Sequence, residues 1–328
     1  MKPLVSVIVP NYNHAAFLKE RLDSVFNQTF QDFEVILLDD CSTDDSIEIL
    51  SNYALQPKVT HCVFNERNTG NTFSQWNKGL ALAKGEFIWI AESDDFCDVN
   101  LLQELLKPMK QNENIVLSYC QSNRVNCESL NTGDWLSHTD DLDKELFLSD
   151  FIMKGNDFIE NFLIFKNVIP NASAVIFRRD EVFKKIKKLN QSSYLKYCGD
   201  WLFYIQLVVN KEICYNSKKL NSFRYHNRSV IASAKKTNDR ITIIDIDLKM
   251  RNIVMSFLKQ QKISKLNIIK LRNKKIKRNL NYEKALLFFR NNNKLKGVIL
   301  LFALPDLFLK NYKFKKHFKL RINRFLNK

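Results

Sequence analysis

Two adjacent carboxylates, Asp94 and Asp95, follow directly on the apolar run at residues 86–91. Their negative charges repel each other, and a divalent cation with oxygen ligands commonly offsets such a repulsion. A cation held by one or two carboxylates keeps coordination positions open for the oxygens of a substrate diphosphate. The alternative is structural: one carboxylate caps the helix that follows, and the other is solvated. The pair therefore predicts either a metal site or a helix N-terminus.

A second pair, Asp39 and Asp40, follows the apolar run at residues 33–38 in the same way. A carboxylate at such a position can accept a hydrogen bond from a nucleobase N–H or from ribose hydroxyls. The alternative is a turn and a helix cap within the segment Asp-Asp-Cys-Ser-Thr-Asp. Taken together, the two pairs describe a cleft with acidic walls, which suits a metal–nucleotide complex.

The elements that must position these carboxylates alternate between strand and helix. Apolar runs typical of buried strands occupy residues 4–9, 33–38, 59–63, 86–91 and 115–119, and segments of helical periodicity separate them. This alternation predicts a mostly parallel sheet with helices on both faces. Ligands of such sheets bind outside the carboxyl ends of the strands. The polar residues expected there are Asn11, Tyr12, Asp39, Asp40, Asp94 and Asp95.

The pattern is less regular beyond residue 123. Residues 124–170 hold several acids and little periodicity, and we expect an insertion or a wall around the site. Further elements are expected as a strand at 172–177, helices at 179–188 and 201–209, and short strands at 213–215 and 222–225. We therefore expect an α/β domain at 1–235, with halves at 1–123 and 124–235, and a basic helical region at 236–328.

The formal net charge of +16 is unevenly distributed along the chain. Residues 235–328 hold 26 Lys and Arg against 5 Asp and Glu, whereas the first 234 residues hold 25 against 30. The basic character belongs to one segment, and the overall charge is therefore no argument for a nucleic-acid-binding protein.

The sequence lacks the motifs of several other protein classes. Its seven glycines form neither the G-x-G-x-x-G fingerprint nor a P-loop. Its seven cysteines are irregularly spaced and include no C-x-x-C, which argues against zinc ribbons and thiol redox sites. The first apolar run is too short for a signal peptide, and no run of about 18 apolar residues predicts a membrane span. We expect a reducing, cytoplasmic location.

Six separated motifs resemble those of family 2 glycosyltransferases, in the order that the family has them. They are P-x-Y-N after the first strand, S-x-x-x-Q-T-F-x-D-F-E, D-D-x-S-T-D, N-x-G, N-x-G-x-x-x-A-x-G-E and the acidic motif that ends in Asp94 and Asp95. The resemblance covers about residues 3–105. It continues more weakly through Asn-Val-Ile-Pro-Asn-Ala-Ser-Ala-Val and Cys-Gly-Asp-Trp to about residue 235, and nothing at 240–328 resembles the family.

The resemblance implies the GT-A fold and a nucleotide-sugar donor, with a UDP-sugar the first expectation. It also implies a divalent cation such as Mn²⁺ or Mg²⁺ and inversion at the anomeric carbon. Residues 1–123 would then bind the donor, and residues 124–235 would form the acceptor side.

The same resemblance assigns donor-binding residues. Pro10 and Tyr12 match the tip of the first strand, which lines the nucleoside. Asp40, with Asp39 beside it, matches the aspartate that binds the base, and Asn68 belongs to the N-x-G motif on the donor side.

Residues Asp94 and Asp95 match the D-x-D-type motif, with metal binding expected of both and a donor contact expected of Asp94. Two positions depart from the family's pattern. Glu92 stands where the first acid of the motif is expected, and Trp76 stands where the family often has a basic residue.

The acidic residue at the start of a helix behind the acceptor site matches Asp200, which we expect to be the catalytic base. An inverting transfer needs one carboxylate placed to remove the proton of the acceptor hydroxyl. The alternative is that Asp200 only caps its helix. His226, in an R-x-H element, is a further candidate metal ligand, and Arg224 or Arg228 could neutralise the diphosphate.

The C-terminal segment at 294–328 combines an apolar stretch, broken by Pro305 and Asp306, with Lys, Arg and aromatic residues. It fits an interfacial segment on an anionic membrane surface. It also fits a helical subdomain with a solvated basic face, and RNA binding is the least favoured interpretation.

The sequence as a whole predicts a metal-dependent, inverting glycosyltransferase that serves surface polysaccharide biosynthesis. The acceptor would be a hydroxyl of a glycan or a lipid-linked sugar, at the cytoplasmic face of the cell membrane. One alternative is a nucleotidyltransferase of related fold, although the glycine-rich basic loop that it needs after the first strand is missing. Another is a non-catalytic membrane- or nucleic-acid-binding protein that acts through its basic tail.

Overall fold

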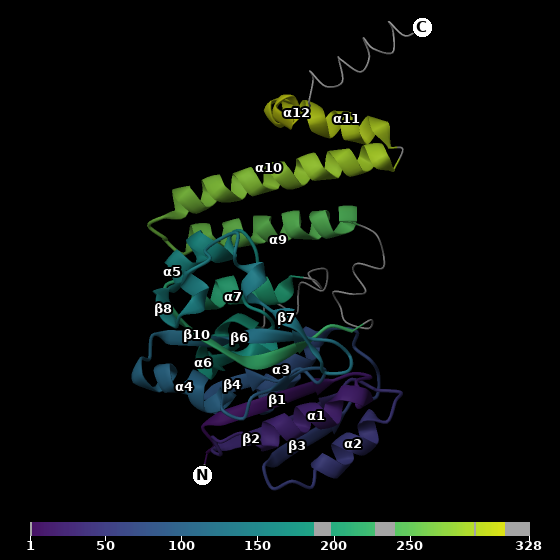
Figure 1. The fold of residues 1–328 in the computed structure, drawn as a ribbon, viewed down its shortest axis with the longest axis vertical. Helices are drawn as coiled ribbons and strands as arrows, with labels where there is room; N and C mark the ends of the chain where they lie inside the picture. The colour runs from purple at the N-terminus through teal and green to yellow at the C-terminus, as the bar shows by residue number, and fades with distance from the viewer. Residues whose placement is uncertain (1, 187–197, 227–239, 292, 312–328) are drawn as a thin grey trace, which may run out of the picture.

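The computed structural model describes residues 2–186, 198–226, 240–291 and 293–311 (Figure 1). The strands are β1 (Val5–Asn11), β2 (Phe33–Asp39), β3 (Val59–Phe64), β4 (Phe87–Ile90), β5 (Phe96–Cys97), β6 (Ile115–Val125), β7 (Asn131–Asp134), β8 (Phe151–Lys154), β9 (Val175–Arg178) and β10 (Glu212–Arg224). The helices are α1 (Ala15–Phe26), α2 (Ser46–Tyr53), α3 (Thr72–Leu82), α4 (Leu101–Gln111), α5 (Gly155–Phe158), α6 (Arg179–Ile186), α7 (Gly199–Val208), α9 (Arg240–Gln260), α10 (Leu266–Arg290), α11 (Lys294–Phe302) and α12 (Pro305–Asn311).

The strands form one sheet in the order β3-β2-β1-β4-β9-β6-β10-β5, with β7 beside β6 and β8 beside β10. β1 is parallel to β2 and β4, and β2 is parallel to β3, so the carboxyl ends of these strands share one edge. β9 runs antiparallel between β4 and β6. The expected fold class is confirmed, as a mixed sheet whose N-terminal part is parallel.

A single long strand, β10, replaces the two short strands expected at 213–215 and 222–225. Register shifts around Asn216 and Lys219 keep the polar middle of the strand paired with β6. Bulges of this kind accommodate residues that do not fit the alternation of inward and outward side chains along a strand. For this reason the sequence pattern shows a break between two short strands where the structure has one strand. The end of β10 pairs with β5 and so brings Arg224 to the loop that follows β4.

Helices on both faces of the sheet bury its apolar strands. On one face α1 packs Leu18 and Leu22 against the strands. On the other, α3 packs Trp76 and Leu80. Gly79 allows α3 to lie this close, because a Cβ atom there would be 2.3 Å from Cγ2 of Ile8.

The segment expected to be irregular, 124–170, contains β7, β8, α5 and a π-helical turn at Ile159–Leu163. Its Phe147, Phe158 and Phe162 belong to the same core as α7. The segment expected to form a wall around the site is therefore an integral part of the fold. Its strand β8 joins the main sheet by pairing with β10.

The C-terminal helices stack in sequence on this body (Figure 1). α9 packs against α7, α10 against α9, and α11 and α12 against α10. The expected boundary at residue 235 lies outside the described residues. Within the part of the chain that the structure describes, no helix is both long and apolar enough to cross a bilayer.

Candidate active site

The tips of β1 and β2 are joined by the buried carboxylate of Asp39. Its Oδ2 accepts hydrogen bonds from Asn11 Nδ2 (2.8 Å) and Ser42 Oγ (2.6 Å). Its Oδ1 accepts a third from the backbone N–H of Ser42 (2.7 Å). Asp39 therefore has a structural role at this edge of the sheet. Its neighbour Asp40 is slightly nearer the surface.

Asp40 joins β2 to the loop that precedes α3. Its Oδ1 accepts a hydrogen bond from Gln75 Nε2 (2.7 Å), and its Oδ2 accepts one from Thr69 Oγ1 (2.8 Å). Asn68 is exposed in the same loop, and its Oδ1 accepts a hydrogen bond from the N–H of Gly70. Gly70 has a φ of +63°, which favours glycine at this turn. A nucleobase that binds Asp40 would therefore compete with its hydrogen bonds from Thr69 and from Gln75 of α3.

The other two donor-site candidates lie at the tip of β1. Pro10 is buried within the strand, whereas 43% of the Tyr12 side chain is exposed. Tyr12 is therefore the ring that can face a nucleoside, and Pro10 acts on the shape of the strand end.

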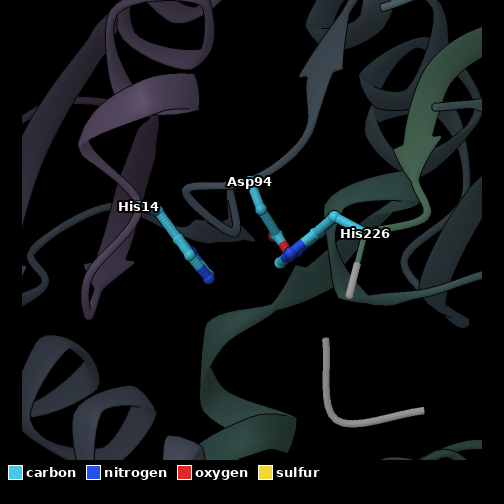
Figure 2. A group of neighbouring side chains, drawn as sticks. All are labelled: His14, Asp94 and His226. Carbon is cyan, nitrogen blue, oxygen red and sulfur yellow. The ribbon is translucent and has the colours of Figure 1, made fainter. Parts of the chain in front are cut away.

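Two histidines from distant parts of the chain converge on Asp94. His14 precedes α1, His226 follows β10, and Figure 2 shows both side chains directed at the carboxylate. One possible ligand atom from each residue lies within 4.8 Å of the others, and His226 Nε2 is 3.0 Å from Asp94 Oδ2. Burial alone would raise the pKa of Asp94, but the two imidazoles outweigh it and lower the pKa to about 2. A fixed negative charge thus lies between them.

This set of donors fits a divalent transition-metal ion. Two imidazole nitrogens and one carboxylate oxygen leave coordination positions for oxygens of a ligand. Mn²⁺ accepts such a mixed set, whereas Mg²⁺ prefers oxygen ligands throughout. His14 Nδ1 lies 2.8 Å from Ser93 Oγ, and such an outer hydrogen bond is typical of histidines that bind metals.

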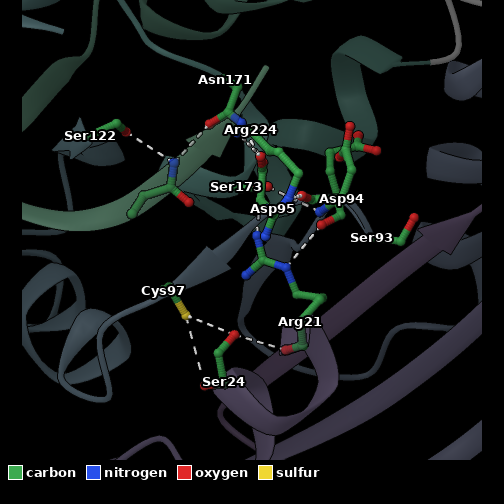
Figure 3. A network of polar contacts seen from close by, with 12 residues as sticks. Arg21, Ser24, Ser93, Asp94, Asp95, Cys97, Ser122, Asn171, Ser173 and Arg224 are labelled. Carbon is green, nitrogen blue, oxygen red and sulfur yellow. Dashed lines mark hydrogen bonds and ion pairs between the residues drawn. The ribbon is translucent and has the colours of Figure 1, made fainter. Parts of the chain in front are cut away.

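The neighbouring carboxylate, Asp95, points in another direction (Figure 3). It is completely buried, where its Oδ2 accepts a hydrogen bond from Asn171 Nδ2 (2.5 Å) and its Oδ1 accepts one from the N–H of Arg224 (3.0 Å). Burial and the charge of Asp94 raise the pKa of Asp95, and the Arg21 guanidinium 3.8 Å away opposes them. The structure brings Asp94 to the histidines and does not bring Asp95 there.

Next to Asp94 and Asp95, the buried Arg224 connects three separate segments of the chain. Its Nε donates to the carbonyl of Asp94 (2.7 Å), its Nη1 donates to the carbonyl of Asn126 (2.9 Å), and its Nη2 pairs with Glu20 (2.5 Å). Because the guanidinium is fully buried, the expected contact between Arg224 and a diphosphate does not fit its position. Arg228, the other candidate for that contact, lies outside the described residues.

The two departures from the family's pattern form one pair. Trp76 Nε1 donates a hydrogen bond to Glu92 Oε1 over 2.8 Å. Burial and the charge of Asp94 raise the pKa of Glu92 to about 8, so this carboxyl is protonated at neutral pH. Glu92 therefore adds no second charge beside Asp94.

Asp200 lies in the first turn of α7, two residues after the N-cap, Cys198. Cys198 holds the N-cap position, but Oδ1 of Asp200 accepts a hydrogen bond from the first-turn N–H of Trp201 (2.8 Å) and its Oδ2 accepts one from Asn167 Nδ2 (3.1 Å), so its position is compatible both with stabilising the helix start and with a role as base. Burial raises the pKa of Asp200 to about 6, although both hydrogen bonds act against the rise. Such a carboxylate is ionised at neutral pH and is a stronger base than a solvated one.

The start of α7 lies against the start of α3. A Cβ atom on Gly199 would be 2.5 Å from Cε2 of Phe73, so glycine is needed for this approach. Phe73 is in edge contact with Trp76, which holds Glu92. One helix, α3, therefore connects the acidic loop after β4 with the helix that carries Asp200.

Side chains from several elements hold the segment that carries Asn167. Trp201 Nε1 donates to the carbonyl of Leu163 (2.7 Å), and Arg251 of α9 donates to the carbonyls of the next two residues (2.6 and 3.0 Å). His138 Nε2 lies 3.0 Å from the carbonyl of Asn167. Arg251 thus connects the C-terminal helices to the segment just before Asn167, the residue that donates a hydrogen bond to Asp200.

Sequence reasoning missed three of these residues. His14 directly follows the P-x-Y-N motif, and its place beside a strand tip is a signal that could have singled it out. Asn167 opens the segment at 167–175 that weakly resembles the family, but its contact with Asp200 could not be read from that resemblance. Arg21 carries no signal, because its role depends on Asp95, which is remote in the sequence.

Residues 6–187 match the family described as Glycosyl transferase family 2. The poly(ribitol-phosphate) beta-glucosyltransferase of Bacillus spizizenii is 36% identical over 113 residues, which are 33% of this chain and 18% of that protein. The chain matches less than half of the length of the curated relatives, so this similarity concerns part of each relative and not its whole activity.

Two solved structures share the fold. S. aureus TarS 1–349 in complex with UDP-GlcNAc has a TM-score of 0.60 at 19% identity, covering 95% of this chain and 77% of that one. The mannosyltransferase PcManGT from Pyrobaculum calidifontis, in complex with GDP-Man and Mn²⁺, has a TM-score of 0.59 at 14% identity, covering 99% and 81%. These likenesses establish the GT-A fold, and the match of more than half of the sequence establishes that this chain belongs to glycosyl transferase family 2.

Proposed function

We propose that this chain transfers a sugar, with inversion, from a nucleotide-diphospho-sugar to a hydroxyl of a glycan or lipid-linked acceptor. The observation that carries the proposal is that two carboxylates differ in pKa and in position. Asp94 has a low pKa and lies between two histidines, whereas Asp200 has a raised pKa and lies on a separate helix. One suits the binding of a cation and the other suits the removal of a proton.

Donor binding is assigned to the edge of the sheet where β1, β2 and β4 end. We propose that Tyr12 and Asp40 contact the nucleoside, with Pro10 and Asp39 shaping the strand tips and Asn68 on the adjoining loop. UDP-sugars are the first donors to test, because TarS was solved with UDP-GlcNAc.

The cation-binding residues in this proposal are Asp94, His226 and His14, while Asp95 positions them from beneath. The presence of Mn²⁺ in the PcManGT complex agrees with the mixed nitrogen and oxygen donors here. A bound divalent cation would neutralise the charge that builds up on the departing diphosphate. Arg224 holds the backbone of Asp94 in place and so orients its carboxylate.

Proton removal is assigned to Asp200, with Asn167 as its positioning residue. An in-line attack needs the acceptor hydroxyl beside a carboxylate that is ionised before the reaction and accepts the proton during it. The nucleotidyltransferase alternative gains no support, because the matched family is one of glycosyl transferases. A role in surface polysaccharide synthesis is supported by the name of the poly(ribitol-phosphate) relative.

A screen of nucleotide-sugars tests the proposal directly. We expect one class of donor to raise the melting temperature of the full chain when Mn²⁺ is present, and to be hydrolysed slowly without an acceptor. Stabilisation by free nucleotides alone, with no preference for any nucleotide-sugar, would contradict a transferase.

The rate of transfer should depend on pH through Asp200. Because burial raises its pKa to about 6, the carboxylate is lost as the pH falls through that value, and the rate should fall about tenfold per unit below it. The neighbouring thiol of Cys198 and phenol of Tyr204 have raised pKa values and so stay neutral over this range, whereas burial also raises the pKa of Asp247 against its ion pair with Arg251. Measuring Mn²⁺-dependent donor binding over the same range separates this effect from protonation of the histidines.

Replacing Asn167 should move that pH profile. In Asn167→Asp the side chain still accepts the hydrogen bond from Ile169, but it loses its donor to Asp200 and places a like charge beside it. The pKa of Asp200 should then rise by about one unit or more, which moves the acid limb of the rate profile to higher pH. A variant of an exposed residue of α2, Asn52→Asp, serves as the control. An unchanged acid limb in Asn167→Asp would remove Asn167 from its positioning role.

A further inference from the structure

One face of α11 is apolar and exposed. Leu295, Val298, Ile299 and Phe302 recur at the spacing of one helical face, and their exposed fractions are 73, 38, 60 and 81%. Leu309 of the next helix, α12, is also exposed, with an exposed fraction of 64%. We call these five residues the α11 face. Single exposed apolar residues are ordinary, but a continuous row on one helix marks a binding surface.

The protein itself does not cover this face within the residues that the structure describes. α11 rests on α10 through Gly297, where a Cβ atom would be 2.7 Å from the ring of Phe289. Gly297 is the only buried residue of α11, so its apolar row points away from α10. The helix lies at the end of the molecule opposite to β1–β3 (Figure 1).

The surroundings of the α11 face are cationic. Lys294 and Lys296 are exposed on the same helix. The four acidic residues described after residue 239 are each paired with a base, in the pairs Asp245–Lys284, Asp247–Arg251, Glu283–Arg240 and Asp306–Arg278. The remaining Lys and Arg therefore leave a positive surface, and the sequence at 312–328 adds seven more bases and no acid.

The cationic surroundings favour one of the possible binding partners of the α11 face over the others. A second copy of the chain would bring one cationic surface against another, and the basic segment at 312–328 would be repelled in the same way. RNA offers the right charge, but it binds through stacking on aromatic rings, and four of the five residues of the α11 face are aliphatic. Aliphatic side chains ringed by Lys match a lipid bilayer with anionic headgroups.

We propose that the α11 face inserts into the headgroup region of an anionic membrane and fixes the enzyme there from one side. Each of the apolar side chains would leave water for the acyl boundary, while Lys294 and Lys296 remain at the level of the lipid phosphates. This attachment is independent of the transfer reaction, since no residue of the α11 face belongs to the candidate active site. It would place the enzyme on the surface where a lipid-linked acceptor is found.

Vesicle sedimentation of the full chain tests the proposal. We expect binding to vesicles that contain phosphatidylglycerol, little binding to pure phosphatidylcholine, and weaker binding as salt is raised. The double variant Ile299→Ser with Phe302→Ser should lose at least about tenfold in affinity and keep its melting temperature, because both side chains are exposed. Leu55→Ser, an exposed leucine near α2, is the matched control and should bind like the wild type.

Three results would overturn the proposal. Undiminished vesicle binding by the double variant would show that the α11 face is not inserted, above all if Lys315→Gln with Lys316→Gln abolishes binding instead. A wild-type dimer that the double variant turns into a monomer would make a second copy the occupant. Binding of a single-stranded RNA that depends on Ile299 and Phe302 would make nucleic acid the occupant.

Discussion

An Asp200→Asn variant is expected to fold, to bind the donor with Mn²⁺, and to transfer sugar at least about a hundredfold more slowly than the wild type. Asparagine cannot take the proton of the acceptor hydroxyl, and general-base catalysis usually contributes a factor of that size or more. The donor is assigned to the ends of β1, β2 and β4, so its affinity should not change. Single-turnover transfer with a competent acceptor measures the first quantity, and calorimetry with the donor measures the second.

The stability of this variant should fall only slightly. Its side-chain oxygen can still accept the hydrogen bond from Trp201, but its amide then faces the Asn167 amide as donor against donor. Losing one such hydrogen bond costs about 1 kcal/mol, and removing a buried charge offsets part of that. Asp140→Asn, at an exposed residue of the same wall, is the control. If Asp200→Asn keeps most of its transfer rate, the base is another residue and the proposed mechanism fails.

Local sequence patterns predict the parallel half of the sheet and the residues at its edge. Each of β1, β2 and β4 is a mainly apolar run, interrupted only by Ser6 in β1 and Glu34 in β2, because helices cover both faces of the sheet, and polar residues lie at or shortly after each carboxyl end. Their positions at the ends of these strands therefore identify Asp39, Asp40 and Asp94 as candidate site residues from the sequence alone. The full length of β10 is not predictable from its sequence. Its bulges place polar residues inside the strand, and only the pairing with β6 makes the strand continuous.

The direction in which a side chain points is not predictable from its neighbours. Asp94 and Asp95 are adjacent in the sequence, yet one faces histidines and the other faces Arg21 and Asn171. Successive residues point to different sides of the backbone, so a pair of carboxylates seldom serves one ligand unless the loop turns between them. Only the contacts of remote segments reveal which of the two faces the site.

Two matched variants should separate these carboxylates more sharply than any other experiment. Asp94→Asn is expected to lower the affinity for Mn²⁺ by more than about a hundredfold, since even an outer hydrogen-bond partner of a metal ligand is worth roughly 10–100-fold. Its melting temperature should also fall, because a pKa lowered to about 2 means that the charged carboxylate stabilises the fold at neutral pH through the histidines, so the loss of Mn²⁺ affinity is the readout that distinguishes this variant. His226→Gln should resemble it.

Asp95→Asn is expected to lose stability and to keep its affinity for Mn²⁺. Its amide would present an N–H donor to the Asn171 amide and to the Arg21 guanidinium, which are themselves donors. An unsatisfied buried donor costs about 1–3 kcal/mol, and removal of the Asp95 charge offsets part of that cost because burial and Asp94 raise the pKa of Asp95 to about 7, so the melting temperature should fall by a few degrees. Below its transition, the folded protein should still bind Mn²⁺ through Asp94, His226 and His14. Mn²⁺ titration followed by electron paramagnetic resonance, with thermal unfolding of the same samples, measures both effects. A stable Asp95→Asn protein that no longer binds Mn²⁺ would make Asp95 the ligand and would require its side chain to turn away from Arg21 when the cation enters.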